Sequence, residues 1–200
     1  MENEIMIQEE TDLSTTNMFE NNLLEQAKFL SNSTIVPVQY QRKPENCYIA
    51  IDMANRMGVP VMMVMQNLYI VQGKPSWSGT AIKSMLENSG KFEDLETVYV
   101  GQPNTDNWGA FVTAKLKKNG KVLKGATVTI KTAKDEGWYN KAGSKWKTMP
   151  ELMLTYRANA WFARQFAPEL LMGLQSVEEV EDVSKPTINK VANPYEKGDN

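Results

Sequence analysis

The most distinctive feature of this sequence is a set of lysines and arginines interleaved with aromatic side chains. One loop, residues 132–147, ends on Trp146 and Lys147. In the segment that follows, Arg157 and Arg164 are seven residues apart, a spacing that places both on one face of a helix. Cations bind phosphate groups and flat rings stack on unpaired bases, so the combination predicts an interaction with single-stranded nucleic acid.

Each of these residues also has an ordinary structural role that competes with nucleic-acid binding. The two arginines could form ion pairs with acids such as Glu151 or Glu169, and Trp161, between them, could lie in the core. The sequence leaves both alternatives open. Replacing Arg157 by alanine would separate them, because loss of a buried ion pair shows mainly as a lower melting temperature.

The charge of the chain is segregated, although 22 basic and 24 acidic residues leave a net charge of only −2. Seven acids and one lysine give residues 1–33 a charge of −6, and seven acids and three lysines give residues 168–200 a charge of −4. The middle of the chain therefore carries +8. Residues 115–147 hold ten lysines against two acids, a density typical of a surface that binds a polyanion. The alternative is a lysine-rich hairpin that is merely solvated.

Side chains for catalysis or metal binding are scarce. The sequence has no histidine and one cysteine, Cys47, which excludes histidine-based triads and thiolate zinc clusters. Gly73-Lys74 lacks the glycine five residues earlier that a P-loop needs, and the acidic pairs 94/96 and 135/136 have no clear partners for a metal. We therefore expect no enzymatic activity and no cofactor or metal. No apolar run approaches the ~20 residues that span a bilayer, so we expect a cytoplasmic protein without membrane contact.

Hydrophobic periodicity and turn residues predict an α+β fold. The expected elements are helices over 17–31, 44–57, 60–67, 78–89 and 149–167, a short strand and turn at 69–77, and strands over 95–101, 109–117 and 121–131. Three parts of the chain are expected: a disordered acidic N-terminus (1–16), a single α+β domain (17–182) and a disordered C-terminal tail (183–200).

The strands over 109–117 and 121–131 are the clearest hairpin, because apolar and polar residues alternate in both. A three-residue loop keeps the faces consistent, since it pairs Lys117 with Lys121 and Leu116 with Val122, and it requires a left-handed Gly120. This register places four lysines on the face away from the core: Lys115, Lys117, Lys121 and Lys131. Like charges this close repel, and a phosphate backbone would give them a partner. Lysines that line one groove would support this interpretation, and scattered lysines would weaken it.

Three long segments, in this order, resemble the RecT family of phage single-strand annealing proteins. They are PENCYIAIDMANRMG at residues 44–58, MQNLYIVQGKPSW at residues 65–77 and MPELMLTYRANAWFAR at residues 149–164. The resemblance extends from about residue 30 to residue 182. Four residues match positions that recur in the family: Lys74, Trp77, Arg157 and Arg164.

The resemblance to the RecT family, which is related to Red beta, implies a function and a fold. The function is binding of single-stranded DNA and ATP-independent annealing of complementary strands, through a duplex intermediate, in phage homologous recombination. Partners would be further copies of the chain, in rings or helical filaments, and a possible phage exonuclease, inside a bacterial host cell. The fold would be a three-stranded antiparallel sheet followed by a long helix (a β-β-β-α core), with N-terminal helices packed around it.

The charge pattern and the resemblance together define the candidate DNA-binding residues. They are Lys74, Trp77, Lys115, Lys117, Lys121, Lys131, Trp146, Lys147, Arg157 and Arg164. The main alternative function is a DNA-binding accessory or assembly protein that does not anneal strands. A metal-dependent nuclease is a third hypothesis, and the acidic pairs support it poorly.

Overall fold

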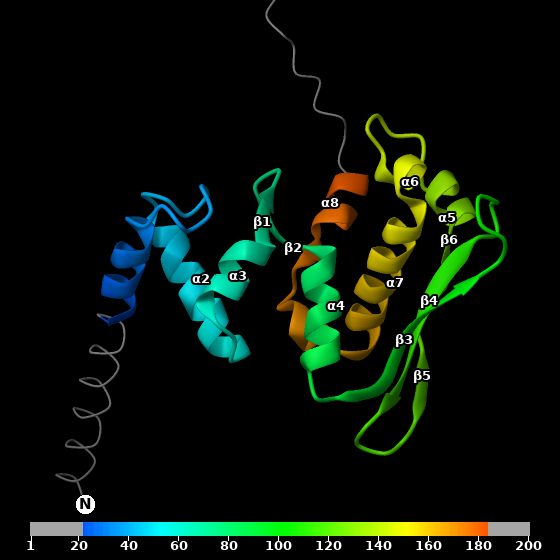
Figure 1. The fold of residues 1–200 in the computed structure, drawn as a ribbon, viewed down its shortest axis with the longest axis horizontal. Helices are drawn as coiled ribbons and strands as arrows, with labels where there is room; N and C mark the ends of the chain where they lie inside the picture. The colour runs from blue at the N-terminus through cyan, green and yellow to red at the C-terminus, as the bar shows by residue number, and fades with distance from the viewer. Residues whose placement is uncertain (1–21, 184–200) are drawn as a thin grey trace, which may run out of the picture.

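A computed structural model of the protein describes residues 22–183 and has the predicted α+β architecture (Figure 1). In chain order, its elements are a helix over residues 22–31, α2 (Pro44–Met57), α3 (Val61–Asn67), β1 (Leu68–Val71), β2 (Lys74–Trp77), α4 (Gly79–Asn88), β3 (Phe92–Val100), β4 (Gly109–Leu116), β5 (Val122–Lys124), β6 (Val128–Thr129), α5 (Ile130–Asp135), α6 (Lys145–Thr148), α7 (Pro150–Phe166), the 3-10 helix η1 (Pro168–Leu171), β7 (Gln175–Ser176) and α8 (Val177–Val183). The expected disordered N-terminus, and the expected tail except Val183, lie outside the described residues.

The centre of the fold is the expected antiparallel sheet with a long helix across one face. Strand β4 pairs with β3 on one side and with β5 and β6 on the other. The inward side chains of β4 are the predicted set, and Ala110, Val112 and Ala114 are all buried. On α7, Phe162 packs edge-on against Phe92 of β3, with ring centroids 5.3 Å apart. Helix α7 therefore covers the inner face of the sheet.

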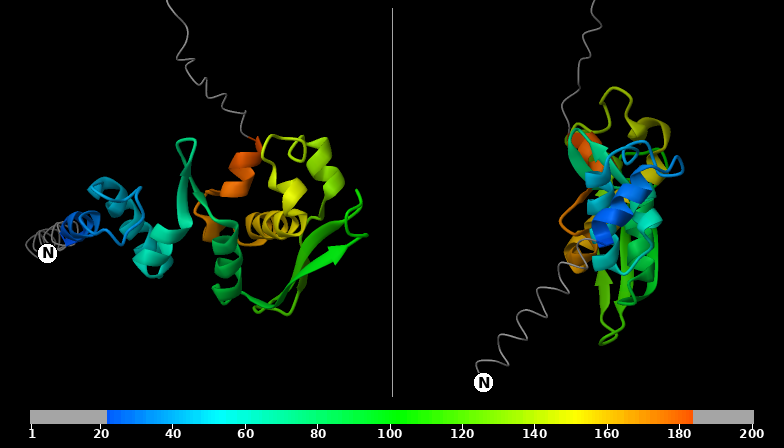
Figure 2. Two further views of the ribbon diagram at one scale, coloured as in Figure 1. Left: turned by 45° about the horizontal axis from the view of Figure 1, so that its top comes forward. Right: turned by 90° about the vertical axis from the view of Figure 1, so that its left-hand side faces the viewer.

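The N-terminal helices α2 and α3 lie to one side of this sheet-and-helix body (Figures 1 and 2). A small second sheet, of order β1-β2-β7, lies between the two parts. Strand β7 pairs in parallel with β2, so Ser176 lies beside Trp77 although the two are 99 positions apart in the chain. This pairing brings the segment that begins α8 back to the middle of the molecule, next to α4 and α7.

Several local signals in the sequence are confirmed. Gly58 ends α2 with a left-handed φ of 65°. The Ser78 hydroxyl caps α4 by accepting a hydrogen bond of 3.0 Å from the Ala81 N–H. Pro150 occupies the first turn of α7, where its missing N–H has no cost. Among residues 22–183, no helix is both long and apolar enough to cross a bilayer.

The predicted hairpin register is correct at one end and wrong at the other. Ala110 pairs with Val128 as that register requires, but Val122 pairs with Lys115 instead of Leu116. The loop therefore has four residues, and the N–H of Gly120, with a left-handed φ of 69°, donates to the Leu116 carbonyl over 2.8 Å.

The register with β4 shifts by one residue in the break between β5 and β6. There the Gly125 N–H donates to the Val112 carbonyl over 2.8 Å, and the strand changes phase. Leu123 consequently faces the core, whereas Val122 is exposed. The predicted strand also ends early, because Thr129 caps α5 and draws Lys131 into a helix. The predicted inner face is therefore confirmed for β4 and for Val128, but it is wrong for Val122 and Leu123, because a bulge shifts the alternation by one residue.

Candidate nucleic-acid interface

The ten candidate residues do not lie in one groove. Lys115, Lys117 and Lys121 belong to the β4–β5 hairpin, Lys131 to α5, and Lys74 and Trp77 to β2. The remaining four are Trp146 and Lys147 on α6, and Arg157 and Arg164 on α7. The β4–β5 hairpin and the α6–α8 region are at opposite ends of α7 (Figure 1). Lys131, on α5, lies apart from the three lysines of the hairpin, so the four predicted lysines are scattered, which weakens the interpretation that rests on charge alone.

Two of the predicted lysines are neutralised by neighbouring acids. Lys115 forms an ion pair with Asp94 at 3.0 Å across the bulge in β3, and Lys131 pairs with Asp135 at 2.6 Å along α5. The hydrogen bonds and charges of these two carboxylates raise the pKa of both ammonium groups. Both pairs are exposed, so they contribute little to stability and leave the lysines accessible.

The tip of the β4–β5 hairpin carries lysines of a different kind. Lys117, Lys118 and Lys121 are exposed and form no ion pair with any residue in the described part of the chain. Next to them, the ammonium of Lys124 lies 4.2 Å from the centre of the Phe111 ring on the outer face of the sheet. We call Lys117, Lys118 and Lys121 the hairpin lysines. They are three like charges held close by a four-residue loop.

The two predicted tryptophans are not available for base stacking in this structure. Trp77 is fully buried beneath η1, and its indole N–H donates to the Leu171 carbonyl over 3.2 Å. Trp146 is also fully buried. Their neighbours Lys74 and Lys147 are exposed, and the Lys147 ammonium lies 5.9 Å from the centre of the Tyr139 ring. Rings of this size are drawn into the core because they bury a large apolar area.

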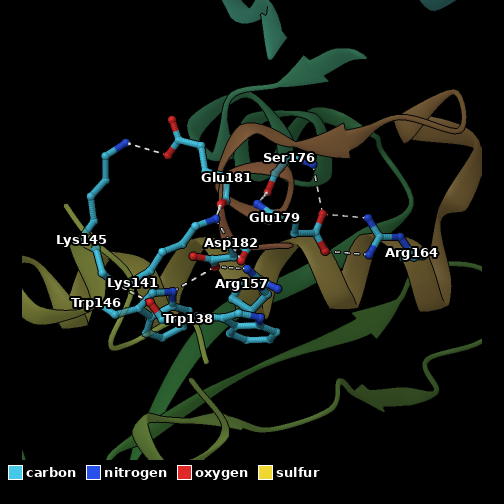
Figure 3. Close-up of polar contacts among 11 residues, drawn as sticks. Trp138, Lys141, Lys145, Trp146, Arg157, Arg164, Ser176, Glu179, Glu181 and Asp182 are labelled. Atoms are coloured by element: carbon cyan, nitrogen blue, oxygen red, sulfur yellow. Dashed lines mark hydrogen bonds and ion pairs between the residues drawn. The ribbon is translucent and has the colours of Figure 1, made fainter. Parts of the chain in front are cut away.

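The predicted arginines of α7 face an acidic partner, helix α8 (Figure 3). Arg157 forms an ion pair with Asp182 in which the two side chains are only 4% and 8% exposed. Arg164 binds Glu179 through both guanidinium nitrogens, at 2.7 and 2.8 Å. Ion pairing of these arginines was one of the two alternatives in the sequence, but the partners are not Glu151 or Glu169.

Two lysines before α7, Lys141 in a loop and Lys145 at the start of α6, bind the same helix. Lys145 pairs with Glu181 at 3.2 Å, and the Lys141 ammonium donates to the backbone carbonyl of Glu181. The indole N–H of Trp146 donates to the Asp182 carboxylate over 2.9 Å. Helix α8 thus contacts all the lysines and arginines drawn in Figure 3, namely Lys141, Lys145, Arg157 and Arg164.

Aromatic rings line the floor of this contact. The Arg157 guanidinium lies over the Trp138 ring, 4.0 Å from its centre, and the Trp138 and Trp146 rings are 5.8 Å apart. A guanidinium prefers such a flat aromatic face. The Nε atom of Arg157 is buried and makes no hydrogen bond. The Nε–H group of Arg157 is therefore a buried donor without an acceptor among the described residues.

Burial dominates the electrostatics of the Arg157–Asp182 pair. Desolvation lowers the pKa of Arg157 despite the nearby carboxylates, and desolvation raises the pKa of Asp182 despite the Trp146 hydrogen bond and the Arg157 charge. Both shifts disfavour the charged forms, so mutual attraction does not fully offset the loss of water. The Arg164–Glu179 pair differs. Burial opposes ionisation of Glu179, but Arg164 and the Ser176 N–H outweigh it, and its pKa is lowered.

Glu178 meets the N-terminal end of α4. The backbone N–H of Gly79, the first residue of α4, and the Ser176 hydroxyl both favour the charged form of its carboxylate. It is only 8% exposed, and its Oε2 atom has no partner. Burial outweighs both groups and raises the pKa of Glu178. A helix N-terminus carries a partial positive charge, which suits an anion in this position.

Sequence reasoning missed half of this contact. Trp138, Lys141 and Lys145 were not among the candidates, and neither were the acids of α8. The available signal was opposite charge: residues 141–147 are basic, and residues 178–182 hold four acids. No periodicity rule shows that these two segments meet. Their contact depends on the parallel pairing of β7 with β2.

The comparisons with known proteins add no relative. No family model, curated protein or solved structure matches this chain.

Proposed function

We propose that this protein binds single-stranded DNA and anneals complementary strands without ATP, as a non-enzymatic, cofactor-free factor in phage homologous recombination. The observation that carries the proposal is the set of hairpin lysines, exposed at a strand end and free of ion pairs within the described residues. The resemblance of three sequence segments to the RecT family supports it. Because charges of one sign held together repel, a polyanion is the partner that such a loop would bind most favourably.

Annealing requires two negatively charged strands to approach each other. Lysines that neutralise phosphates release counterions and reduce this repulsion, so binding is expected to weaken steeply with salt. A ring for base contact is available at Tyr139, which is half-buried and has the ammonium groups of Lys134 and Lys147 at 5.1 and 5.9 Å from its centre. Copies of the chain in a ring or filament would repeat these sites along one strand. A phage exonuclease would supply the single strand.

A second candidate function is a DNA-binding accessory or assembly protein that does not anneal. The separation of the hairpin lysines from the cations near α8 favours it, because the two sets lie at opposite ends of α7 and do not form one continuous cluster of cations (Figure 1). Such a protein would hold one strand without presenting its bases to another.

Annealing of two complementary labelled oligonucleotides, without ATP or magnesium and across a salt series, separates these functions. We expect acceleration at low salt that fades as salt increases. Binding without acceleration would favour the accessory function. Absence of both binding and annealing would contradict both functions.

A further inference from the structure

Helix α8 places each of its four acidic side chains on a group that commonly binds phosphate in proteins. Glu179 lies on a bidentate arginine, Arg164, and Asp182 on a second arginine, Arg157. Glu181 pairs with a lysine, Lys145, and Glu178 lies at the start of α4, where the first backbone N–H of the helix favours its charge. We call these partners, together with Lys141, the basic cradle. Its two arginines are seven residues apart on α7, or about 10 Å along the helix axis.

The acids of α8 fit the cradle incompletely. Arg157 Nε and Glu178 Oε2 are both buried and both lack a hydrogen-bond partner. The Arg157–Asp182 pair loses its water without full compensation, as the lowered pKa of Arg157 and the raised pKa of Asp182 indicate. A phosphate has more acceptor oxygens than a carboxylate and could satisfy the donor that Asp182 leaves free.

Apart from its charge contacts, α8 is held by the pairing of β7, which directly precedes it, with β2 and by little apolar packing. The helix has seven residues, too few to be stable alone, and Val180 is its one buried apolar residue. Val183, at its end, is 65% exposed. Charge contacts therefore account for most of what holds α8 against α7, and charge contacts are what a polyanion can replace.

We propose that α8 is a built-in substitute for a nucleic-acid strand, which occupies the basic cradle until a single strand displaces it. This inference rests on the proposed function and adds a second phosphate-binding site with its own regulation. Departure of α8 would remove the acceptor of the Trp146 indole N–H and uncover the guanidinium that lies on Trp138. The cradle would then offer cations and aromatic rings together, and three of these residues, Trp146, Arg157 and Arg164, are sequence candidates.

Hydrogen exchange of the full chain, with and without saturating oligo(dT) at low salt, tests the displacement directly. We expect the backbone amides of α8 to lose protection when oligo(dT) binds, while the amides of α2 do not change. Amides of α8 that stay as protected as in the free protein would overturn the inference.

A charge variant tests the competition independently. Glu181→Gln removes one acid from α8 at an exposed pair, with side chains 44% and 47% exposed, so folding is preserved. The matched control is Glu136→Gln, which removes an exposed acid that directly follows α5 and forms no ion pair with a described residue. We expect the affinity of Glu181→Gln for oligo(dT) to exceed that of this control by about threefold. Equal affinities would overturn the inference.

The same measurements distinguish this inference from the proposed function. If oligo(dT) binds but α8 stays protected and the two variants behave alike, the inference fails and the proposed function stands. If oligo(dT) does not bind to any of these proteins, both fail.

Discussion

Arg157, in the middle of α7, and Asp182, near the end of α8, form an ion pair in which both side chains are more than nine-tenths buried. The Trp138 ring lies beneath the guanidinium, and the Trp146 N–H binds the same carboxylate. Such a pair contributes little net stability, because its attraction is set against the loss of water from two charges. Removal of either partner, however, would leave the other as a buried charge without a counter-charge.

Replacement of Asp182 by asparagine should destabilise the protein far more than an exposed change of the same kind. The variant leaves the Arg157 guanidinium buried without a counter-charge, although the amide can still accept from Trp146. Removing one partner of a buried pair costs about 3–5 kcal/mol. The free energy of unfolding in urea measures it.

The matched control is Asp52→Asn, which removes the acid of the exposed pair with Arg56 on α2. Its cost should be about 0.3–0.5 kcal/mol, the range for such pairs on a helix surface. Equal losses in the two variants would show that burial of the Arg157–Asp182 pair has no energetic consequence.

Replacement of Glu178 by glutamine should stabilise the protein near neutral pH by about 1 kcal/mol, because a neutral amide costs less to bury than a carboxylate. Glu178 is almost fully buried, and one of its oxygens has no partner. The exposed Glu136→Gln variant should change stability little. A loss of stability in Glu178→Gln would mean that the negative charge at the start of α4 is favourable.

The pH dependence follows from the direction of the Glu178 shift. Burial raises its pKa in the folded state above the unfolded value of about 4.3. The folded state therefore binds more protons between these two values, and stability falls as pH rises through that window. The advantage of Glu178→Gln over the natural chain should thus grow from about pH 4.3 upward and then level off. Unfolding curves at a series of pH values measure it.

Glu179 should show the opposite dependence. Arg164 and the Ser176 N–H, against the effect of burial, hold its pKa below the ordinary value. Its contribution is present above about pH 4.3 and is lost as pH falls through the lower folded value. Glu179→Gln should lower the free energy of unfolding by about 1–2 kcal/mol at neutral pH and by less in acid. The loss is moderate because the Arg164 side chain is 43% exposed and water screens its charge. A loss that does not depend on pH would contradict this assignment.

The fold was largely predictable because its signals are local. Gly58 ends α2, Ser78 caps α4, and alternation identifies the inner face of β4 from Ala110 to Ala114. Each of these depends on a few neighbouring residues. The register of β5 was not predictable in the same way, because the break at Gly125 shifts the phase without changing the hydrophobic pattern on either side.

The candidate site was harder, because its key contacts are long-range. A sequence shows that Arg157 is a cation but not that Asp182 neutralises it, since their contact depends on the path of the chain through β7. Likewise, the sequence shows an aromatic residue at Trp146 but not whether its ring stacks on a base or packs in the core, where the structure places it. The unpaired Lys117 and Lys121 were found correctly as exposed cations at a strand end.

Gly125 permits the close approach of the sheet to α7. A Cβ atom at this position would lie 3.2 Å from the Phe162 ring and 3.4 Å from the Val112 carbonyl oxygen. Gly125→Ala should therefore lower the free energy of unfolding by about 1–2 kcal/mol through overpacking. In a Phe162→Leu background, the cost of Gly125→Ala should be smaller by about 1 kcal/mol. An unchanged cost would mean that Phe162 is not the obstacle.

The hairpin lysines give the last prediction, which concerns function. Lys117→Glu combined with Lys121→Glu should weaken oligo(dT) binding strongly and leave thermal stability nearly unchanged, because both side chains are exposed and free of ion pairs within the described residues. If both contact phosphates, the slope of log K against log salt should become shallower by about 1.4. The control, Lys28→Glu with Lys43→Glu, makes the same charge change at exposed sites near the N-terminal helices. Titrations across a salt series measure both slopes, and equal weakening in the two double variants would mean that net charge, and not the hairpin, determines binding.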